Sequence, residues 1–196
     1  MPFAIPRIQY LNYSKTGNTS SGSPIITNIA STTGLQVGMF CRGTNIPSTA
    51  TILSVDSGTQ ITLNQNATGT ATGVALELGF EILFSYPPIE AKGEIYDPKE
   101  RESTSISGVV QVSVDHIEVV RKFKFSFLTE ALKNSLETFA STHALYGKTF
   151  RYFNDQTLST YLDVELKTRK FEPKKIAPKG IDVYTWEVDL DTRRAL

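Results

Sequence analysis

The chain has 196 residues, a length that suits one domain or one domain carrying a small second one. About 40% of the residues are hydrophobic, which allows a packed core and excludes wholesale disorder. Twenty basic and 20 acidic residues leave no net charge, so the chain lacks the basic balance of a protein that binds nucleic acid through its whole surface. Zero net charge also weakens the repulsion between copies, which suits a subunit that associates.

Cysteine content and the first residues indicate the compartment. Cys41 is the single cysteine, so an internal disulfide is impossible and the fold does not depend on oxidation. The opening residues, MPFAIPRIQY, show no basic segment followed by a long apolar run, so we expect no secretory signal. No window approaches 18 apolar residues, so we expect no membrane-spanning helix and no membrane partner. These features predict a protein that folds in a reducing cytoplasm.

An abrupt change of composition marks a module within the chain. Between Thr16 and Leu78 only three residues are charged, and Ser, Thr, Gly and Asn dominate instead. Disordered linkers can have such a composition. Here, however, turn signals separate five short apolar runs, at 24–29, 38–43, 50–55, 60–63 and 73–78. This spacing predicts a small β-sandwich or barrel over residues 16–78.

Two predicted strands flank this module. PRIQYLN at 6–12 precedes it, and FEILFSYPP at 80–88 follows it. Loop tips tolerate insertions, because the cost of closing a loop grows slowly with its length. We therefore predict a host domain made of residues 1–15 and 79–196, with the module 16–78 inserted at the tip of a hairpin.

The host domain continues with a polar segment and an alternating one. Residues 90–105, EAKGEIYDPKERESTS, predict an exposed loop or a long arm. Over 109–128, apolar and polar residues alternate, which predicts two antiparallel strands or one long bent strand with one face buried. The apolar positions on that face are Val110, Val112 and Val114, followed by Phe123, Phe125 and Phe127, which we expect to anchor the core.

A single helix is predicted over about 130–145. Thr129 suits the N-cap, and Glu130 complements the helix dipole. Gly147 is the expected C-terminal stop. The helical spacing places one apolar stripe against the sheet, made of Leu132, Leu136, Phe139 and His143.

Further strands are predicted at 148–153, 159–173 and 182–194, and in the last of these alternate residues from Tyr184 to Leu190 form an apolar face. The predicted fold class is therefore mainly β. It is a β-sandwich with one helix packed on it, plus an inserted small β-sandwich module.

The sequence predicts no catalytic, cofactor-binding or metal-binding residues. His116 and His143 lie in a predicted strand and on the helix stripe, and no G-x-S-x-G motif presents a nucleophile beside either one. One Cys and two distant His cannot supply the ligands of a zinc site. Cys41 lies within an apolar run and is expected to be a small buried hydrophobe. Phosphate-binding loops of the G-x-x-x-x-G-K-[ST] and G-x-G-x-x-G types are absent.

The charged clusters are interpreted as surface features. Asp189 and Asp191 lie on the polar face of a strand, which favours solvation over glycosidase chemistry. Two basic clusters could contact nucleic acid, but acidic residues elsewhere balance them, which favours a partner-subunit contact or solvation. They are Arg121, Lys122 and Lys124, and Lys167, Arg169, Lys170, Lys174, Lys175 and Lys179. We expect no direct sequence-specific nucleic-acid binding.

The order of segments in the host domain resembles the distal tail protein and lambda-type minor tail protein M group of long-tailed bacteriophages. FKFSFLTEALKNSLETFASTHALYGKTFRYF at 123–153 carries most of the likeness. The supporting segments are YPP at 86–88, SGVVQ at 107–111, YLDVELK at 161–167 and VYTWEVDLDTRR at 183–194. The module at 16–78 is similar to the small Ser/Thr/Gly-rich, often immunoglobulin-like β modules of phage tail and fibre proteins.

This resemblance implies a structural virion protein of the phage tail that is assembled in the host cytoplasm. It implies a hexameric ring, and hence a homo-oligomer, that joins the tail tube to the tip or baseplate hub or fibres. Other tail proteins are then its partners, and it is no enzyme. The arm near 90–105 could add a strand to the sheet edge of a neighbouring subunit. The module could bind fibres or host-surface glycans.

Three alternatives stay open. Another tail or neck ring, such as a tube or terminator subunit, would share this composition. A carbohydrate-binding tail adhesin is disfavoured because Phe40 is the one aromatic residue that the module offers. A tip-associated hydrolase is disfavoured by the shortage of His and Cys.

Overall fold

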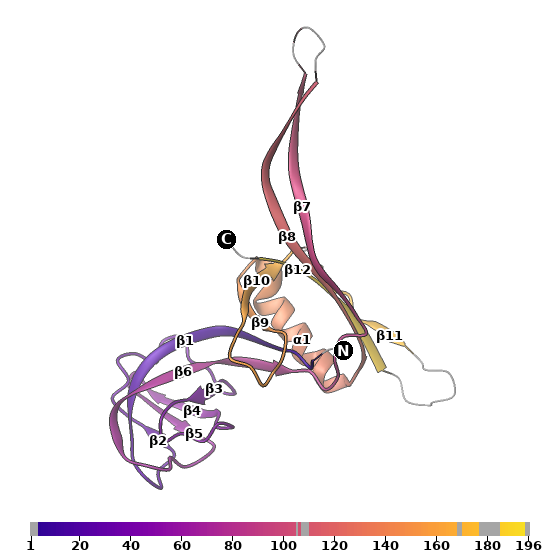
Figure 1. The fold of residues 1–196 in the computed structure, drawn as a ribbon. Helices are drawn as coiled ribbons and strands as arrows, with labels where there is room; N and C mark the ends of the chain where they lie inside the picture. The colour runs from indigo at the N-terminus through magenta and orange to yellow at the C-terminus, as the bar shows by residue number, and fades with distance from the viewer. Residues whose placement is uncertain (1–3, 105, 107–109, 168–169, 177–184, 195–196) are drawn as a thin grey trace. The chain divides into compact units, whose positions relative to one another are not determined.

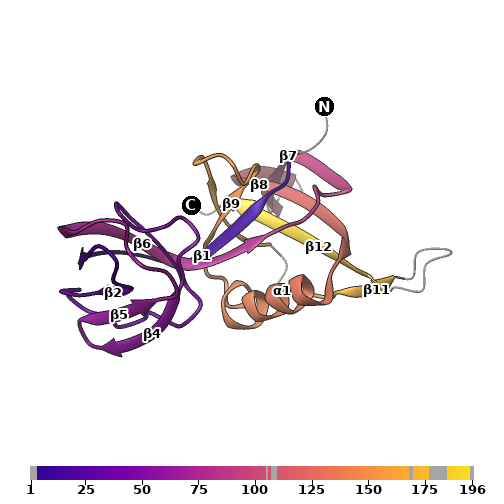
Figure 2. The ribbon, with the colours of Figure 1, turned by 90° about the horizontal axis from the view of Figure 1, so that it is seen from below.

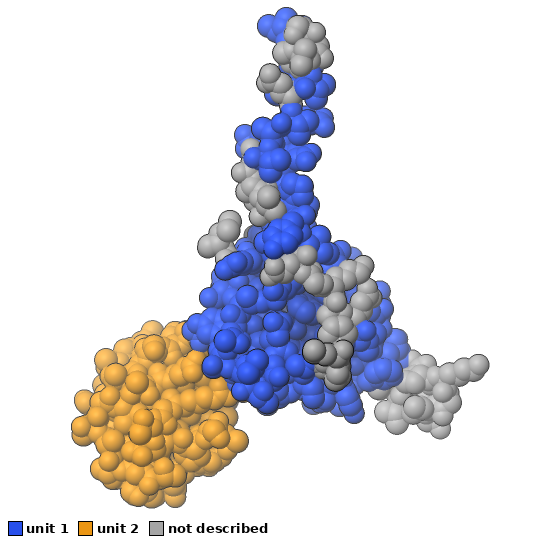
Figure 3. Space-filling view, in the orientation of Figure 1, with its two compact units in different colours: residues 1–8, 82–196 blue, residues 9–81 orange. Residues whose placement is uncertain are grey.

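The computed structural model describes residues 4–104, 106, 110–167, 170–176 and 185–194, except for the side chains of 90–94, 111, 115–117 and 185. It contains two compact units, which are unit 1, residues 1–8 and 82–196, and unit 2, residues 9–81 (Figure 3). Strands make up 53% of the structure and helix 10%. The predicted mainly β fold with a single α-helix is therefore confirmed within the described residues.

Unit 2 is a small two-sheet module around its own core. Strands β2, β5 and β4 form one antiparallel sheet in that order, and β3, β6 and β1 lie in order in the other. The strands are β1 (Arg7–Thr19), β2 (Ile25–Ile26), β3 (Phe40–Arg42), β4 (Ile52–Ser57), β5 (Gln60–Leu63) and β6 (Ala71–Leu83). Their inward-facing residues form one hydrophobic cluster that includes Ile26, Cys41, Ile52, Ile61, Leu63 and Leu76.

The two long strands of the module extend past the change of composition. β1 runs through Thr16 and β6 runs through Leu78, the positions at which the sequence placed its domain boundaries. On the N-terminal side of Thr16 and the C-terminal side of Leu78, the two strands still contact each other. The rings of Tyr10 and Phe80 stack with centroids 5.3 Å apart, and Gln9 Nε2 donates to a Glu81 carboxylate oxygen at 2.8 Å. Strand pairing thus continues into residues whose composition matches the host domain.

Unit 1 is built on a sheet in which β9, β10, β12, β8 and β7 follow in order, with β11 also pairing with β12 (Figures 1 and 2). Each pair of neighbouring strands in this order is antiparallel. The strands are β7 (Glu90–Thr104), β8 (Val110–Leu128), β9 (Phe150–Phe153), β10 (Leu162–Leu166), β11 (Lys174–Ile176) and β12 (Thr185–Arg194). The helical elements are α1 (Glu130–Thr142) and a 3-10 turn, η1 (Ala144–Tyr146).

Helix α1 starts at the predicted cap and ends earlier than predicted. The Thr129 hydroxyl accepts a hydrogen bond from the backbone N–H of Leu132 at 3.2 Å, which is the expected N-cap contact. The sequence predicted a helix to about residue 145, but α1 ends at Thr142 because His143 leaves helical geometry. The chain then tightens into η1 and stops at Gly147, whose φ of 71° is the left-handed conformation that favours glycine.

The helix packs on the sheet through aromatic residues. Leu136 and Phe139 are fully buried, as the predicted stripe required, and Phe139 meets Phe150 of β9 edge-on with centroids 4.9 Å apart. Trp186 of β12 donates from Nε1 to a Glu130 carboxylate oxygen at 2.6 Å. These contacts fix α1 to two strands of the same sheet. Tyr184, which the sequence placed on the same strand face as Trp186, lies outside the described residues.

The prediction that Phe127 belongs to the core is wrong. Phe123 and Phe125 are buried, but the side chain of Phe127 is 50% exposed. Phe127 has a φ of 62°, and the pairing of β8 with β12 shifts register between Trp186 and Val188. This bulge interrupts the alternation, so that Leu128 turns inward in place of Phe127.

Candidate functional site

The reactive side chains that the structure describes serve packing. His143 is buried, and its Nε2 lies 2.8 Å from the carbonyl oxygen of Thr149. Burial lowers the pKa of His143, which keeps the ring neutral at pH 7. Cys41 lies in the core of unit 2, where burial raises the pKa of its thiol to about 12, so it is no thiolate nucleophile near neutral pH. The backbone of His116 pairs with Lys99, but its side chain lies outside the described residues.

Some lysines of the charged clusters pair with carboxylates of a neighbouring strand. Lys122 lies 3.7 Å from a carboxylate oxygen of Asp191, and Lys124 lies 2.9 Å from one of Glu187. Lys170 pairs with its near neighbour Glu172 at 2.9 Å. Arg169 and Lys179 lie outside the described residues. This pairing agrees with solvated or structural roles for the described members.

Metal-binding and membrane-spanning features are absent from the part of the chain that the structure describes. No group of three or more His, Cys, Asp or Glu side chains is placed to hold a metal ion there. No helix among the described residues has the length and apolar character to cross a membrane. The aromatic residue that a sugar site in the module would need, Phe40, is buried, and the guanidinium of Arg42 covers its ring at 4.4 Å from the centroid.

The most distinctive surface of unit 1 is a long two-stranded arm (Figure 1). β7 and β8 pair from Glu90 opposite Lys124 to Thr104 opposite Val110. β12 pairs with β8 only from Val120 onward. Residues 96–104 and 110–119 therefore form a ribbon with no third strand among the described residues, and we call this ribbon the arm.

The arm carries an exposed row of valines on one face. Val110, Val112 and Val114 are 57%, 54% and 54% exposed, which corrects the prediction that this alternating face is buried. A period of two places the three side chains together, but burial needs a second layer, and no described element covers them. Their cross-strand partners, whose side chains share the same face, are Thr104, Glu102 and Glu100. The valine face thus carries two carboxylates.

The opposite face of the arm is polar. Ser113 lies opposite Arg101 and both side chains are exposed. An isolated two-stranded ribbon is marginally stable in water, and an apolar row on it marks a surface that another element covers. The valine face is therefore the candidate interaction surface of unit 1.

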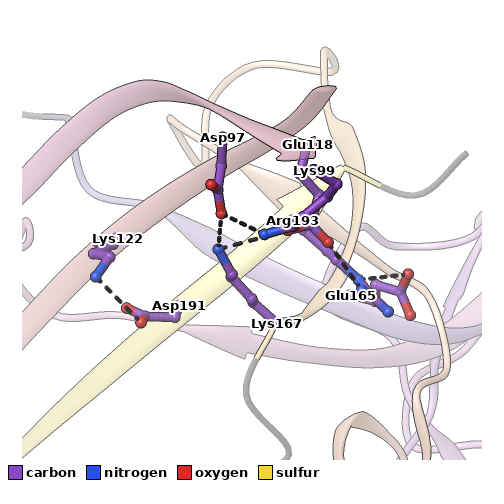
Figure 4. A network of polar contacts seen from close by, with 8 residues as sticks. All are labelled: Asp97, Lys99, Glu118, Lys122, Glu165, Lys167, Asp191 and Arg193. Carbon is purple, nitrogen blue, oxygen red and sulfur yellow. Dashed lines mark hydrogen bonds and ion pairs between the residues drawn. The ribbon is translucent and has the colours of Figure 1, made fainter. Parts of the chain in front are cut away.

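A network of ion pairs anchors the base of the arm (Figure 4). Asp97 of β7 accepts from Lys99 at 2.7 Å and from Lys167, which follows β10, at 2.6 Å. Glu118 of β8 accepts from Arg193 of β12 at 3.0 Å and lies 3.4 and 3.5 Å from the two lysines. Arg193 also donates to Glu165 of β10 at 3.0 Å. The network, defined as these six residues, links the arm to two neighbouring strands.

The network lowers the pKa of two of its carboxyl groups, those of Asp97 and Glu118. Hydrogen bonds from Lys167 and then Lys99 lower the pKa of Asp97 to about 2. For Glu118, burial alone would raise the pKa, but hydrogen bonds from Arg193 and Lys99 outweigh burial and lower it. Asp97 and Glu118 are therefore ionised at neutral pH.

A small hollow lies beside the base of the arm. Val119 and Arg121 of β8, Leu162 and Val164 of β10, and Thr192 and Arg194 of β12 line it. The side chains of Val164 and Thr192 are almost fully buried and form its floor, whereas Arg194 is exposed. The hollow therefore combines an apolar floor with two guanidinium groups.

Comparisons of the chain with models of known protein families, with curated protein sequences and with solved structures found no match.

Proposed function

We propose that the chain is a structural virion protein that forms a hexameric ring at the distal end of a bacteriophage tail, where it joins the tail tube to the tip hub or fibres. The observation that carries the proposal is the arm, which presents the exposed row Val110, Val112 and Val114 on a ribbon anchored by ion pairs. Such a ribbon gains stability when another chain covers it. An arm on one surface and its docking site on another is the arrangement that closes a ring.

The place in the virion comes from the resemblance of residues 123–153 and the segments around them to the distal tail protein and minor tail protein M group. The strand, helix and strand of that run correspond to β8, α1 and β9. The proposal also holds that the chain is no enzyme, and its support is that the described His143 and Cys41 are packed into cores. The zero net charge agrees with self-association.

The first experiment measures the native mass of the purified chain by light scattering, with negative-stain images of the same peak. We expect closed rings of six copies. Val112→Asp places a charge in the valine row and should shift the peak towards the monomer, because a buried unpaired carboxylate opposes docking. Ser113→Asp adds the same charge to the opposite face at the next residue and should leave the rings intact.

The position in the particle needs a second experiment. Gold-labelled antibody against the chain should mark the distal tip of phage particles from the host of origin. Label along the whole tube or at the neck would instead identify the chain as a tube or terminator subunit, the alternative that shares this composition. Monomers in solution together with no label on any particle would overturn the proposal.

A further inference from the structure

We infer that the valine face of the arm packs over the surface around the hollow beside the arm base of a second copy of this chain. The inference rests on the proposed function in one respect, since it names the partner of the arm within the ring. The occupant is a second copy because the two surfaces match each other in polarity and in charge.

The two surfaces carry opposite charges. Glu100 and Glu102 lie beside the valines of the arm, and Arg121 and Arg194 lie beside the apolar floor of the hollow. Bringing the surfaces together buries apolar side chains at the centre and places carboxylates near guanidinium groups at the rim, which is the usual anatomy of a specific interface.

Two arms packed through their valine faces would be a poorer solution. That arrangement would bring the carboxylates of one arm onto the same acidic face of the other, because Arg101 points to the opposite side. Like charges that face each other oppose association. The charge pattern therefore favours arm-to-hollow docking over arm-to-arm docking.

The valine row cannot cover the hollow of its own chain. Val112 and Val119 are seven residues apart on the continuous strand β8, and Val119 lines the hollow. At about 3.3 Å per residue the two lie roughly 23 Å apart. Docking is thus intermolecular and joins two different surfaces, a head-to-tail contact that closes into a ring when the rotation allows it.

Charge reversal tests the pairing. Glu100→Arg with Glu102→Arg should weaken association about tenfold or more, and so should Arg194→Glu in the hollow. Combining Glu100→Arg and Glu102→Arg with Arg194→Glu in one chain should restore part of the lost association, because opposite charges then face each other again. Light scattering across a dilution series measures each variant.

Matched controls distinguish an effect at these two surfaces from a general effect of changed charge. Ser103→Arg with Ser113→Arg adds two guanidinium groups to the opposite face of the arm, and Lys170→Glu reverses an exposed lysine outside the hollow. Both should associate like the unchanged chain. Equal weakening by the controls and the test variants would overturn the inference.

A cross-link gives an independent readout. Cys41 is buried, so thiols introduced by Val112→Cys and Leu162→Cys should be the ones that react with a short bis-maleimide. Cross-linked dimers should form when the two single variants are mixed, and neither variant alone should form them through this contact.

The outcomes separate the inference from the proposed function. Rings that persist in every charge variant and give no cross-link overturn the arm-to-hollow contact while the ring stands. Unchanged chain that stays monomeric at the highest concentration at which it remains dissolved overturns the contact as well. Antibody label then decides separately whether the chain belongs to the tail.

Discussion

Unit 2 and the arm use the same alternation of apolar and polar residues with opposite results. In unit 2, Ile52 of β4 lies opposite Leu63 of β5, and both are buried in the module core. In the arm, Val112 lies opposite Glu102, and its side chain is 54% exposed. The alternation shows which residues share a face, but the layer that covers the face decides whether they form a core or a docking surface.

The largest expected difference between these regions is in the cost of removing a side chain. Leu76→Ala should lower the free energy of unfolding of unit 2 by about 2 to 5 kcal/mol, because Leu76 is fully buried and its loss leaves a cavity. Val112→Ala should change the stability of the dilute monomer by less than about 0.5 kcal/mol, because its site is already exposed.

Two intrinsic probes can report these effects separately. Cys41 is the single cysteine and is buried in unit 2, so its rate of thiol labelling in denaturant measures the opening of that unit. Trp186, the single tryptophan, belongs to unit 1, and its fluorescence follows that unit. An equal loss of stability in the two variants would show that the arm is packed in the monomer.

The core of unit 2 could be predicted from the sequence, and the exposure of the arm only in part. The five apolar runs between Thr16 and Leu78 correspond to positions in the module core, because turn signals confine each run to a short strand. For the arm, exposure is indicated by the polar segment 90–105, which precedes the valine row in the chain. The three valines pair with its last residues, Glu100, Glu102 and Thr104, and so have no apolar cross-strand partner, which points to a face without cover.

The network and the hollow could not be predicted from sequence spacing. Asp97, Glu118, Lys167 and Arg193 are far apart in the chain, and the strand order and register bring them together. Sequence spacing indicates neither the strand order nor the register. The sequence shows the lysine-rich cluster that contains Lys167. The contact of Lys167 with the arm, however, depends on β10 lying two strands from β8 in the sheet.

The next smaller effect concerns the anchoring of the arm, which distinguishes it from a free hairpin. Glu118→Gln should destabilise the β7–β8 pairing at the arm base by about 1 kcal/mol, because it removes the charge that Arg193, Lys99 and Lys167 share. Amide hydrogen exchange at the base of the arm measures this change. Glu172→Gln, which alters an exposed pair with Lys170, should leave exchange at the arm base unchanged.

Acid should release the same anchor in a defined pH window. The pKa of Asp97 is lowered from 3.8 to about 2 by the hydrogen bonds from Lys167 and Lys99. A lowered pKa means that the stabilisation is complete above the ordinary value and is lost as pH falls from about 4 to about 2. Amide protection at the arm base, measured against the intrinsic exchange rate at each pH, should therefore fall across that window.

Substitution separates this effect from general acid unfolding. Asp97→Asn should reduce the loss of amide protection between about pH 4 and pH 2, because no proton is then taken up at that position and Glu118 is left as the network carboxyl group with a lowered pKa. Asp189→Asn changes an exposed carboxylate of β12 outside the network and should retain the full loss. An undiminished loss of protection in Asp97→Asn would assign the transition to other carboxylates.

The smallest expected effect lies where the alternation of β8 breaks. Phe127 is half exposed and has a φ of 62°, a left-handed conformation that costs most residues energy but that asparagine tolerates. Phe127→Asn should therefore change the stability of unit 1 by less than about 1 kcal/mol, because relief of backbone strain offsets the lost contacts. Phe125→Ala, two residues earlier on the buried side, should cost about 3 to 5 kcal/mol. Comparable losses in denaturant unfolding followed by Trp186 fluorescence would place Phe127 back in the core and remove the bulge.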